Sequence, residues 1–128
     1  MSANTRPPVA IDMQHYDRLK NIGELFLEIT PETAEFLLEE LSRADILQSD
    51  DLPSNVVNIG STVTYRDDTS GDAHTFVLVW PVEADIKKDK VSIMTPIGAA
   101  LIGLTEGDGI SWLTNKNDIK HLTVLKVE

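Results

Sequence analysis

The residues with the clearest potential for chemistry are three closely spaced glutamates, Glu28, Glu32 and Glu35. Carboxylate oxygens suit Mg²⁺, which usually shares its coordination shell between one or two protein carboxylates, waters and substrate phosphates. At an exposed tip these side chains could hold such an ion if a partner supplied the other ligands. The alternative is a charged helix end, where Glu32 stabilises the positive end of a helix dipole. The spacing alone favours this alternative.

Other reactive groups give weaker signals. The chain has no cysteine, which excludes disulfides, thiolate metal sites and thiol catalysis. The three histidines have no neighbour at metal-ligand spacing, and no serine stands in a G-x-S-x-G elbow. The acidic segment 67–72 lacks the spacing and the terminal glutamate of a calcium-binding EF-hand, which favours a solvated turn. We therefore expect neither a metal site nor a cofactor.

The first third of the chain has the apolar spacing of two helices. Apolar residues recur every three or four positions, first at Tyr16, Leu19, Ile22, Phe26 and Ile29 and then at Ala34, Leu37, Leu41 and Ala44. Asp12 is suited to cap the first helix, and Thr30 with Pro31 is suited to start the second. The pattern predicts an antiparallel two-helix coiled coil that protrudes as a finger, with about 17 residues and roughly 25 Å in each helix. The alternative is an ordinary helix pair packed on a domain.

Beyond the acidic linker near Asp50 the apolar pattern changes to alternation, which is typical of strands. Strand-like runs separated by turn-forming residues occupy 62–65, 75–80, 91–94, 110–113 and 121–127. Pro96 and Gly103 are suited to begin and end one short helix. The sequence thus predicts an α+β protein with a helical hairpin over residues 1–50. An antiparallel β domain with one short helix follows over residues 51–128.

The charge balance limits the possible partners. The formal net charge is −10, so the chain has no general attraction to phosphate backbones, and we expect no direct binding to nucleic acid. A basic protein surface is the better partner. No run approaches the ~18 apolar residues of a membrane span, and the first residues lack the apolar stretch of a signal peptide. We therefore expect no membrane partner and a cytoplasmic location.

The second half resembles the C-terminal domain of the bacterial Gre transcript-cleavage factors. The matching pieces are 57–63 (VNIGSTV), 82–85 (VEAD), 91–103 (VSIMTPIGAALIG) and 106–108 (EGD). The third piece has the family pattern S-x-x-[ST]-P-I-G-x-A-L-x-G, and the order and spacing of the pieces are those of the family. The resemblance implies an FKBP-like sheet and RNA polymerase as the partner.

The N-terminal half departs from that family. Gre factors have a longer finger, whose Asp-x-x-Glu tip helps to bind the catalytic Mg²⁺ in the polymerase secondary channel. Here Glu32 falls at the glutamate position, but Ile29 stands where the aspartate would be. The adjacent Glu28 points about 100° away around a helix. The short hairpin and the missing carboxylate resemble the Rnk-type regulators of nucleoside diphosphate kinase, which bind polymerase without stimulating cleavage.

The resemblance implies a polymerase-binding transcription regulator that is not an enzyme. It implies docking on the largest catalytic subunit, at the rim of the secondary channel, in competition with Gre-type factors. Asp85, Ser92, Pro96 and Ile97 are the expected contacts, although Pro96 could simply start the helix and Ile97 could belong to the core. Two other functions stay open, namely transcript cleavage through the tip glutamates and an FKBP-like prolyl isomerase.

Overall fold

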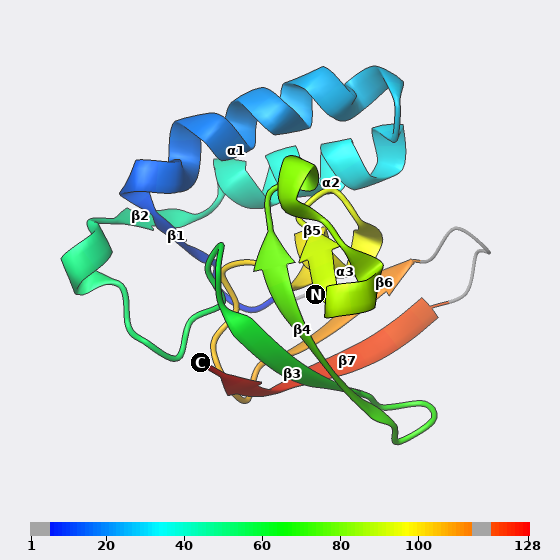
Figure 1. The fold of residues 1–128 in the computed structure, drawn as a ribbon. Helices are drawn as coiled ribbons and strands as arrows, with labels where there is room; N and C mark the ends of the chain where they lie inside the picture. The colour runs from blue at the N-terminus through cyan, green and yellow to red at the C-terminus, as the bar shows by residue number, and fades with distance from the viewer. Residues whose placement is uncertain (1–5, 114–118) are drawn as a thin grey trace, which may run out of the picture.

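The computed structural model describes residues 6–113 and 119–128, and its fold is α+β (Figure 1). The N-terminal part contains strand β1 (Ala10–Asp12), helix α1 (Met13–Leu25), the 3-10 helix η1 (Phe26–Glu28), helix α2 (Pro31–Ser42) and strand β2 (Asp45–Leu47). The predicted helix starts are confirmed, since Asp12 caps α1 and Pro31 is the first residue of α2. The helices have 13 and 12 residues, so they are about 20 and 18 Å long and shorter than predicted.

The helical prediction is wrong beyond Ser42, where the chain forms a strand. Strand β2 pairs in parallel with β1, with Ala10 opposite Asp45, and the backbone N–H of Asp45 donates to the carbonyl oxygen of Val9 at 2.8 Å. Ile11 of β1 and Val9, which directly precedes that strand, are both buried. Three-residue strands are too short to show an alternating pattern, and their pairing joins residues far apart in sequence. Ala44 continues the spacing of the second helical run, so local spacing did not mark the end of the helix at Ser42.

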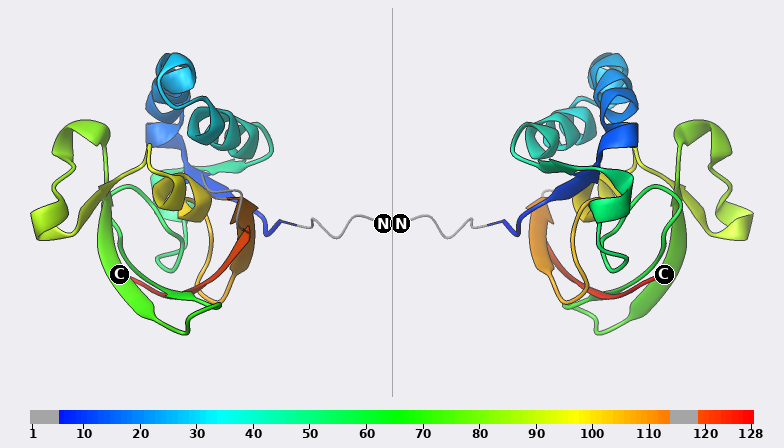
Figure 2. Two further views of the ribbon diagram at one scale, coloured as in Figure 1. Left: turned by 90° about the vertical axis from the view of Figure 1, so that its right-hand side faces the viewer. Right: turned by 90° about the vertical axis from the view of Figure 1, so that its left-hand side faces the viewer.

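The remaining strands form one five-stranded sheet. They are β3 (Thr62–Asp67), β4 (Ala73–Val79), β5 (Lys90–Ser92), β6 (Gly109–Leu113) and β7 (Ile119–Val127), in the order β5-β4-β3-β7-β6. Helix α3 (Pro96–Leu101) completes this half, and Figure 2 shows the sheet curving around it. The five predicted strands and the short helix are confirmed. None of the helices in the described ranges has the length and apolar character needed to cross a membrane.

The prediction of an antiparallel sheet is wrong at one edge. Strand β5 runs parallel to β4, with Val77 opposite Lys90 and Val79 opposite Ser92. The connection contains two further 3-10 helices, η3 (Pro81–Glu83) and η4 (Ile86–Lys88). This crossover brings the chain back beside Val77 before β5 begins, whereas a tight hairpin would have produced an antiparallel neighbour.

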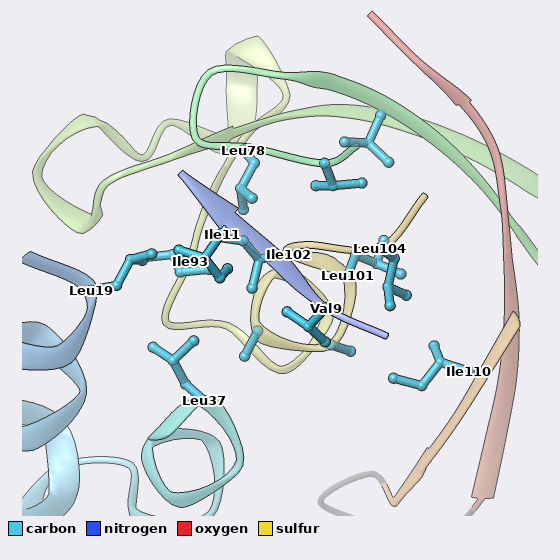
Figure 3. Close-up of a cluster of buried hydrophobic side chains, with 14 of the residues drawn as sticks. Val9, Ile11, Leu19, Leu37, Leu78, Ile93, Leu101, Ile102, Leu104 and Ile110 are labelled. Carbon is cyan, nitrogen blue, oxygen red and sulfur yellow. The ribbon is translucent and has the colours of Figure 1, made fainter. Parts of the chain in front are cut away.

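One hydrophobic core joins the helices to the sheet (Figure 3). Leu19 of α1 and Leu37 of α2 are fully buried in the same cluster as Leu78, Ile93 and Leu101 from the second half. This arrangement matches the alternative of a helix pair packed on a domain. The core cluster crosses the proposed boundary between residues 50 and 51, and the division into two domains stays a prediction.

A buried carboxylate links the helical half of the chain to the half that contains the sheet. Asp12 is only 3% exposed, and its oxygens accept four hydrogen bonds: from the backbone and side chain of Gln14 at 3.0 and 3.1 Å, from Ser49 Oγ at 2.6 Å and from Asn58 Nδ2 at 3.1 Å. Burial by itself would raise the pKa of this carboxyl, but the hydrogen bonds outweigh it and lower the pKa from 3.8 to about 2. Asp12 thus ties the start of α1 to the linker (Ser49) and to the segment before β3 (Asn58).

We predict that Asp12→Asn lowers the free energy of unfolding by about 2 kcal/mol at pH 7, because the charged acceptor is lost while a helix cap is retained. Since the folded-state pKa lies below the unfolded value, this contribution is complete above about pH 5 and disappears as the pH falls through 4 toward 2. Urea unfolding of both proteins from pH 7 to pH 2.5 measures the difference. Asp17→Asn removes the same charge at an exposed position of α1 and serves as the control. Equal stability of wild type and Asp12→Asn at pH 7 would contradict this role.

Candidate protein-binding surface

The crossover between β4 and β5 projects from the edge of the sheet (Figure 2). It carries Val82 and Ile86, which are 86% and 89% exposed and are the most exposed large apolar side chains in the described residues. Two such side chains on one projecting loop make it a candidate contact surface. We call residues 81–89 the crossover loop.

Backbone and capping hydrogen bonds fix the shape of the crossover loop. Asp85 and Lys90 exchange two backbone hydrogen bonds of 2.9 Å, which close the second half of the loop into a ring. The Asp85 carboxylate accepts from the backbone N–H of Lys87 at 3.1 Å and so caps η4. Asp89 ends η4 with φ of +55°, a left-handed conformation that aspartate tolerates better than most residues. Ile86 is therefore held on a preformed support, and the turn that carries Val82 is closed by a bond of 2.9 Å from the backbone N–H of Glu83 to the Trp80 carbonyl oxygen.

Helix α1 braces the root of this loop. Trp80 precedes η3 and is buried, and the guanidinium carbon of Arg18 lies 4.0 Å from the centroid of its ring. The ring of His15 meets the same tryptophan edge-on, at 5.5 Å between centroids. A cation over an indole face contributes about 0.5–2 kcal/mol, depending on its desolvation. The position of the loop thus depends on the position of α1.

The segment after β5 is a tightly hydrogen-bonded turn. Ser92 Oγ accepts from the backbone N–H of Met94 at 2.9 Å, and the Ser92 carbonyl oxygen accepts from both the backbone N–H and the hydroxyl of Thr95. Thr95 Oγ1 in turn accepts from the backbone N–H of Gly98 at 3.1 Å, which caps α3. A Cβ at Gly98 would overlap the Ser92 carbonyl oxygen, so no larger residue fits there. The S-x-x-T-P-I-G pattern is therefore the sequence of this turn.

The expected contact residues flank β5 but have different surroundings. Asp85 pairs with the first residue of β5 and Ser92 is its last residue, while Pro96 and Ile97 open α3. All four are partly exposed, and Ile97 also packs against the core. Each has a structural role, and their role as contacts stays a prediction. The sequence analysis did not single out Val82 and Ile86 as contacts, although Val82 lies in the matching piece 82–85 and Ile86 follows it directly.

The tip glutamates lie at the far end of the helical hairpin. Glu28 ends η1, Glu32 lies in the first turn of α2, and both are exposed. Ile29, which fits the helical spacing in the sequence, is 67% exposed and does not belong to the buried face. Within residues 6–113 and 119–128, no three His, Cys, Asp or Glu side chains are grouped so that they could hold a metal ion.

Comparison with known proteins places most of the chain in one sequence family. The family model described as "Transcription elongation factor, GreA/GreB, C-term" matches residues 52–128. The chain is 32% identical over 124 residues to the regulator of nucleoside diphosphate kinase from Escherichia coli (strain K12). This alignment covers 97% of this chain and 91% of that protein. It is 40% identical over 92 residues to transcription elongation factor GreA from Rickettsia typhi, which covers 71% of this chain and 56% of that factor.

A solved structure has a similar fold over nearly the whole chain. It is a prokaryotic transcription elongation factor GreA/GreB from Nitrosomonas europaea, with a TM-score of 0.74 and 30% identity. The alignment covers 95% of this chain and 98% of that one, so it includes both the helical hairpin and the sheet.

We predict that Gly98→Ala destabilises the protein by about 1–3 kcal/mol, because the added methyl group meets backbone that cannot move without breaking the Ser92–Thr95 turn. Thermal or urea unfolding measures the change. Gly109→Ala is the matched control, since its Cβ would lie 3.6 Å from the Leu122 carbonyl oxygen, an ordinary contact. If both variants unfold like the wild type, the close approach at Gly98 does not constrain the motif.

Proposed function

The chain belongs to the GreA/GreB family of transcription elongation factors, and from that membership we propose that it is a transcription regulator that acts by binding RNA polymerase. The observation that carries the proposal is the crossover loop. Its two most exposed apolar side chains lie within the segment matched by the family model and stand on a support fixed by hydrogen bonds. A rigid support lowers the entropy cost of ordering such side chains in an interface.

We assign docking to the rim of the secondary channel, on the largest catalytic subunit. The contact surface in this proposal consists of the crossover loop with Asp85, followed by Ser92, Pro96 and Ile97 along β5 and the start of α3. Val82 and Ile86 would be the apolar anchors, while Ser92 and Pro96 hold the turn beside them. The net charge of −10 favours a basic site on the polymerase over nucleic acid.

The proposed mechanism is occupancy of the docking site, without transcript cleavage. Helix α1 is only about 20 Å long, and the tip offers Glu28 and Glu32 as separate exposed carboxylates with Ile29 between them. By occupying the rim, the protein would compete with longer-fingered Gre factors in the cytoplasm and would not itself be an enzyme. The prolyl isomerase alternative is disfavoured because Trp80, one of the few aromatic side chains of this half, is covered by Arg18 and His15.

We predict that the double variant Val82→Ser/Ile86→Ser binds purified core RNA polymerase at least about tenfold more weakly than the wild type. The physical reason is that two apolar side chains which the polymerase would cover are lost from the interface. Fluorescence titration of labelled protein against core polymerase gives the dissociation constants, and unlabelled GreA tests competition. Leu125→Ser removes an exposed apolar side chain from β7 and is the matched control. If the wild type shows no binding at micromolar polymerase, the proposed function is wrong.

We further predict that the wild-type protein does not stimulate RNA cleavage in a stalled elongation complex, even at concentrations that saturate binding. A gel assay of 3′-end cleavage, with GreA as the positive control, measures this. Cleavage by the wild type that disappears in Glu32→Ala would contradict the occupancy mechanism and favour a metal-binding tip.

A further inference from the structure

The four most exposed large apolar side chains in the described ranges form two separate pairs. Val82 and Ile86 lie on the crossover loop, and Leu25 and Ile29, which are 70% and 67% exposed, lie where α1 gives way to α2. Figure 2 shows the crossover loop projecting from one side of the molecule and the helical hairpin from its top. We call residues 24–32 the hairpin tip. Because all four side chains are mostly exposed, the two pairs do not cover each other within one chain.

The hairpin tip has a fixed shape. Phe26 packs against the core, and its carbonyl oxygen accepts from the backbone N–H groups of Ile29 and Thr30, at 3.0 and 2.9 Å. A turn closed by these bonds orders the apolar pair of the tip before any partner arrives. Binding through the tip would therefore cost little conformational entropy.

The hairpin tip is negatively charged around its apolar pair. Glu24, Glu28 and Glu32 are all exposed. Residues 24–32 contain these three glutamates, no aspartate and no lysine or arginine, so the tip has a net charge of −3. The ion pairs found in the described ranges of the chain include none of the three carboxylates. Their charge is therefore available to a partner.

The crossover loop has exposed positive charge beside Ile86. Lys87 and Lys88 follow it directly, both are exposed, and neither takes part in the ion pairs of residues 6–113 and 119–128. The Asp85 carboxylate caps η4, and Asp89 adds the one negative charge of residues 86–89. Two lysines and one aspartate give those four residues a net charge of +1, in a chain whose total is −10. The loop therefore offers an apolar pair with a basic edge on the side of Ile86.

The charges of the two surfaces select a second copy of this chain as the occupant. A hairpin tip against another tip would bring six glutamates together, which opposes that pairing. A hairpin tip against the crossover loop of another copy joins apolar to apolar and glutamate to lysine. The net charge of −10 on each copy opposes association at long range, but salt screens that repulsion beyond about 8 Å at physiological ionic strength. The opposite charges that meet at the contact are closer than this distance.

We propose that the chain forms a twofold dimer in which the hairpin tip of each copy covers the crossover loop of the other. A single contact would leave one tip and one loop free to add further copies, whereas the twofold arrangement satisfies both surfaces and closes the assembly. Helix α1 holds the two surfaces on one rigid body, because it ends at the tip and its Arg18 stacks on Trp80 at the root of the loop. The second contact therefore forms at a high effective concentration once the first is made.

The dimer would also regulate the crossover loop. Val82 and Ile86 are the side chains assigned to the polymerase contact, so a copy whose loop is covered by a second copy cannot use it for polymerase. Self-association and polymerase binding would then compete for one surface. This consequence rests on the proposed function, whereas the dimer itself does not.

Sedimentation equilibrium from about 10 µM to about 1 mM measures the dimer, since two small surfaces make a weak interface. We expect Leu25→Ser/Ile29→Ser and Val82→Ser/Ile86→Ser each to raise the dimer dissociation constant at least about tenfold, and Leu125→Ser to leave it unchanged. Far-UV circular dichroism with thermal unfolding verifies that each variant is folded. A wild type that stays monomeric over this range, or that forms species larger than a dimer, would overturn the proposal.

A charge swap tests which surfaces meet. In Glu24→Lys/Glu28→Lys both surfaces have lysines at their edges, and in Lys87→Glu/Lys88→Glu both have glutamates. We expect neither variant to self-associate at concentrations where the wild type is dimeric, because like charges then meet at both contacts. An equimolar mixture should form a heterodimer whose dissociation constant is within about tenfold of the wild-type value, since opposite charges again meet at both contacts. A mixture that stays monomeric would contradict the pairing of tip with loop.

Engineered cysteines test the contact directly, because the chain has none of its own. With oxidised glutathione, Ile29→Cys/Ile86→Cys should form a disulfide-linked dimer on a non-reducing gel, and each single variant should form far less. Equal dimer yields from the double and single variants would contradict the contact.

The same double variant tests the competition. We expect its linked dimer to bind core RNA polymerase at least about tenfold more weakly than its reduced form. Equal binding of both forms would overturn the regulation of the loop. Absence of polymerase binding by the reduced form and the wild type would reject the proposed function, and the sedimentation results would still decide the dimer.

Discussion

The buried carboxylate of Asp12 is the interaction on which the rest of the molecule depends. It begins α1 and at the same time binds Ser49 in the linker and Asn58 ahead of the sheet. The direction of α1 therefore follows from a joint made by three separate segments. Because α1 carries Arg18 against Trp80, the crossover loop is positioned from this joint. Among the described residues Asp12 has no cationic partner. Its carboxylate can nevertheless be buried in the ionised form, because four hydrogen-bond donors replace its water shell.

The family motif has a clear physical basis in this structure. Ser92, Thr95 and Gly98 form a network of short-range hydrogen bonds and one close backbone approach, which together turn the chain from β5 into α3. Gly103 ends that region with φ of +82° and lies against Val9, the residue before β1, where a side chain would overlap. The motif thus preserves the turn and its packing on the N-terminal strand. Direct contact with a partner is assigned mainly to the loop beside it.

Local signals in the sequence were sufficient for much of the fold. Alternation and turn residues located all five strands of the main sheet, while the cap residue Asp12 and the proline at the first position of α2, Pro31, located the two helix starts. The features that the sequence could not supply are non-local. The bonds from Asp12 to Ser49 and Asn58 span 37 and 46 residues, and the β1–β2 pair joins Ala10 to Asp45. Ile29 followed the helical spacing, but the chain leaves the α-helix after Leu25, so that spacing no longer determines which side chains are buried. Exposure of Val82 and Ile86 required the three-dimensional course of the crossover loop.

The central claim about function is that the crossover loop contacts RNA polymerase through its exposed apolar side chains. The most direct measurement is site-specific photocrosslinking to core RNA polymerase, with a photoreactive amino acid placed at position 82, 86 or 125. We predict crosslinks to polymerase from positions 82 and 86, lost when excess unlabelled protein is added, and none from position 125. Crosslinking from position 125 with none from position 82 would contradict the account.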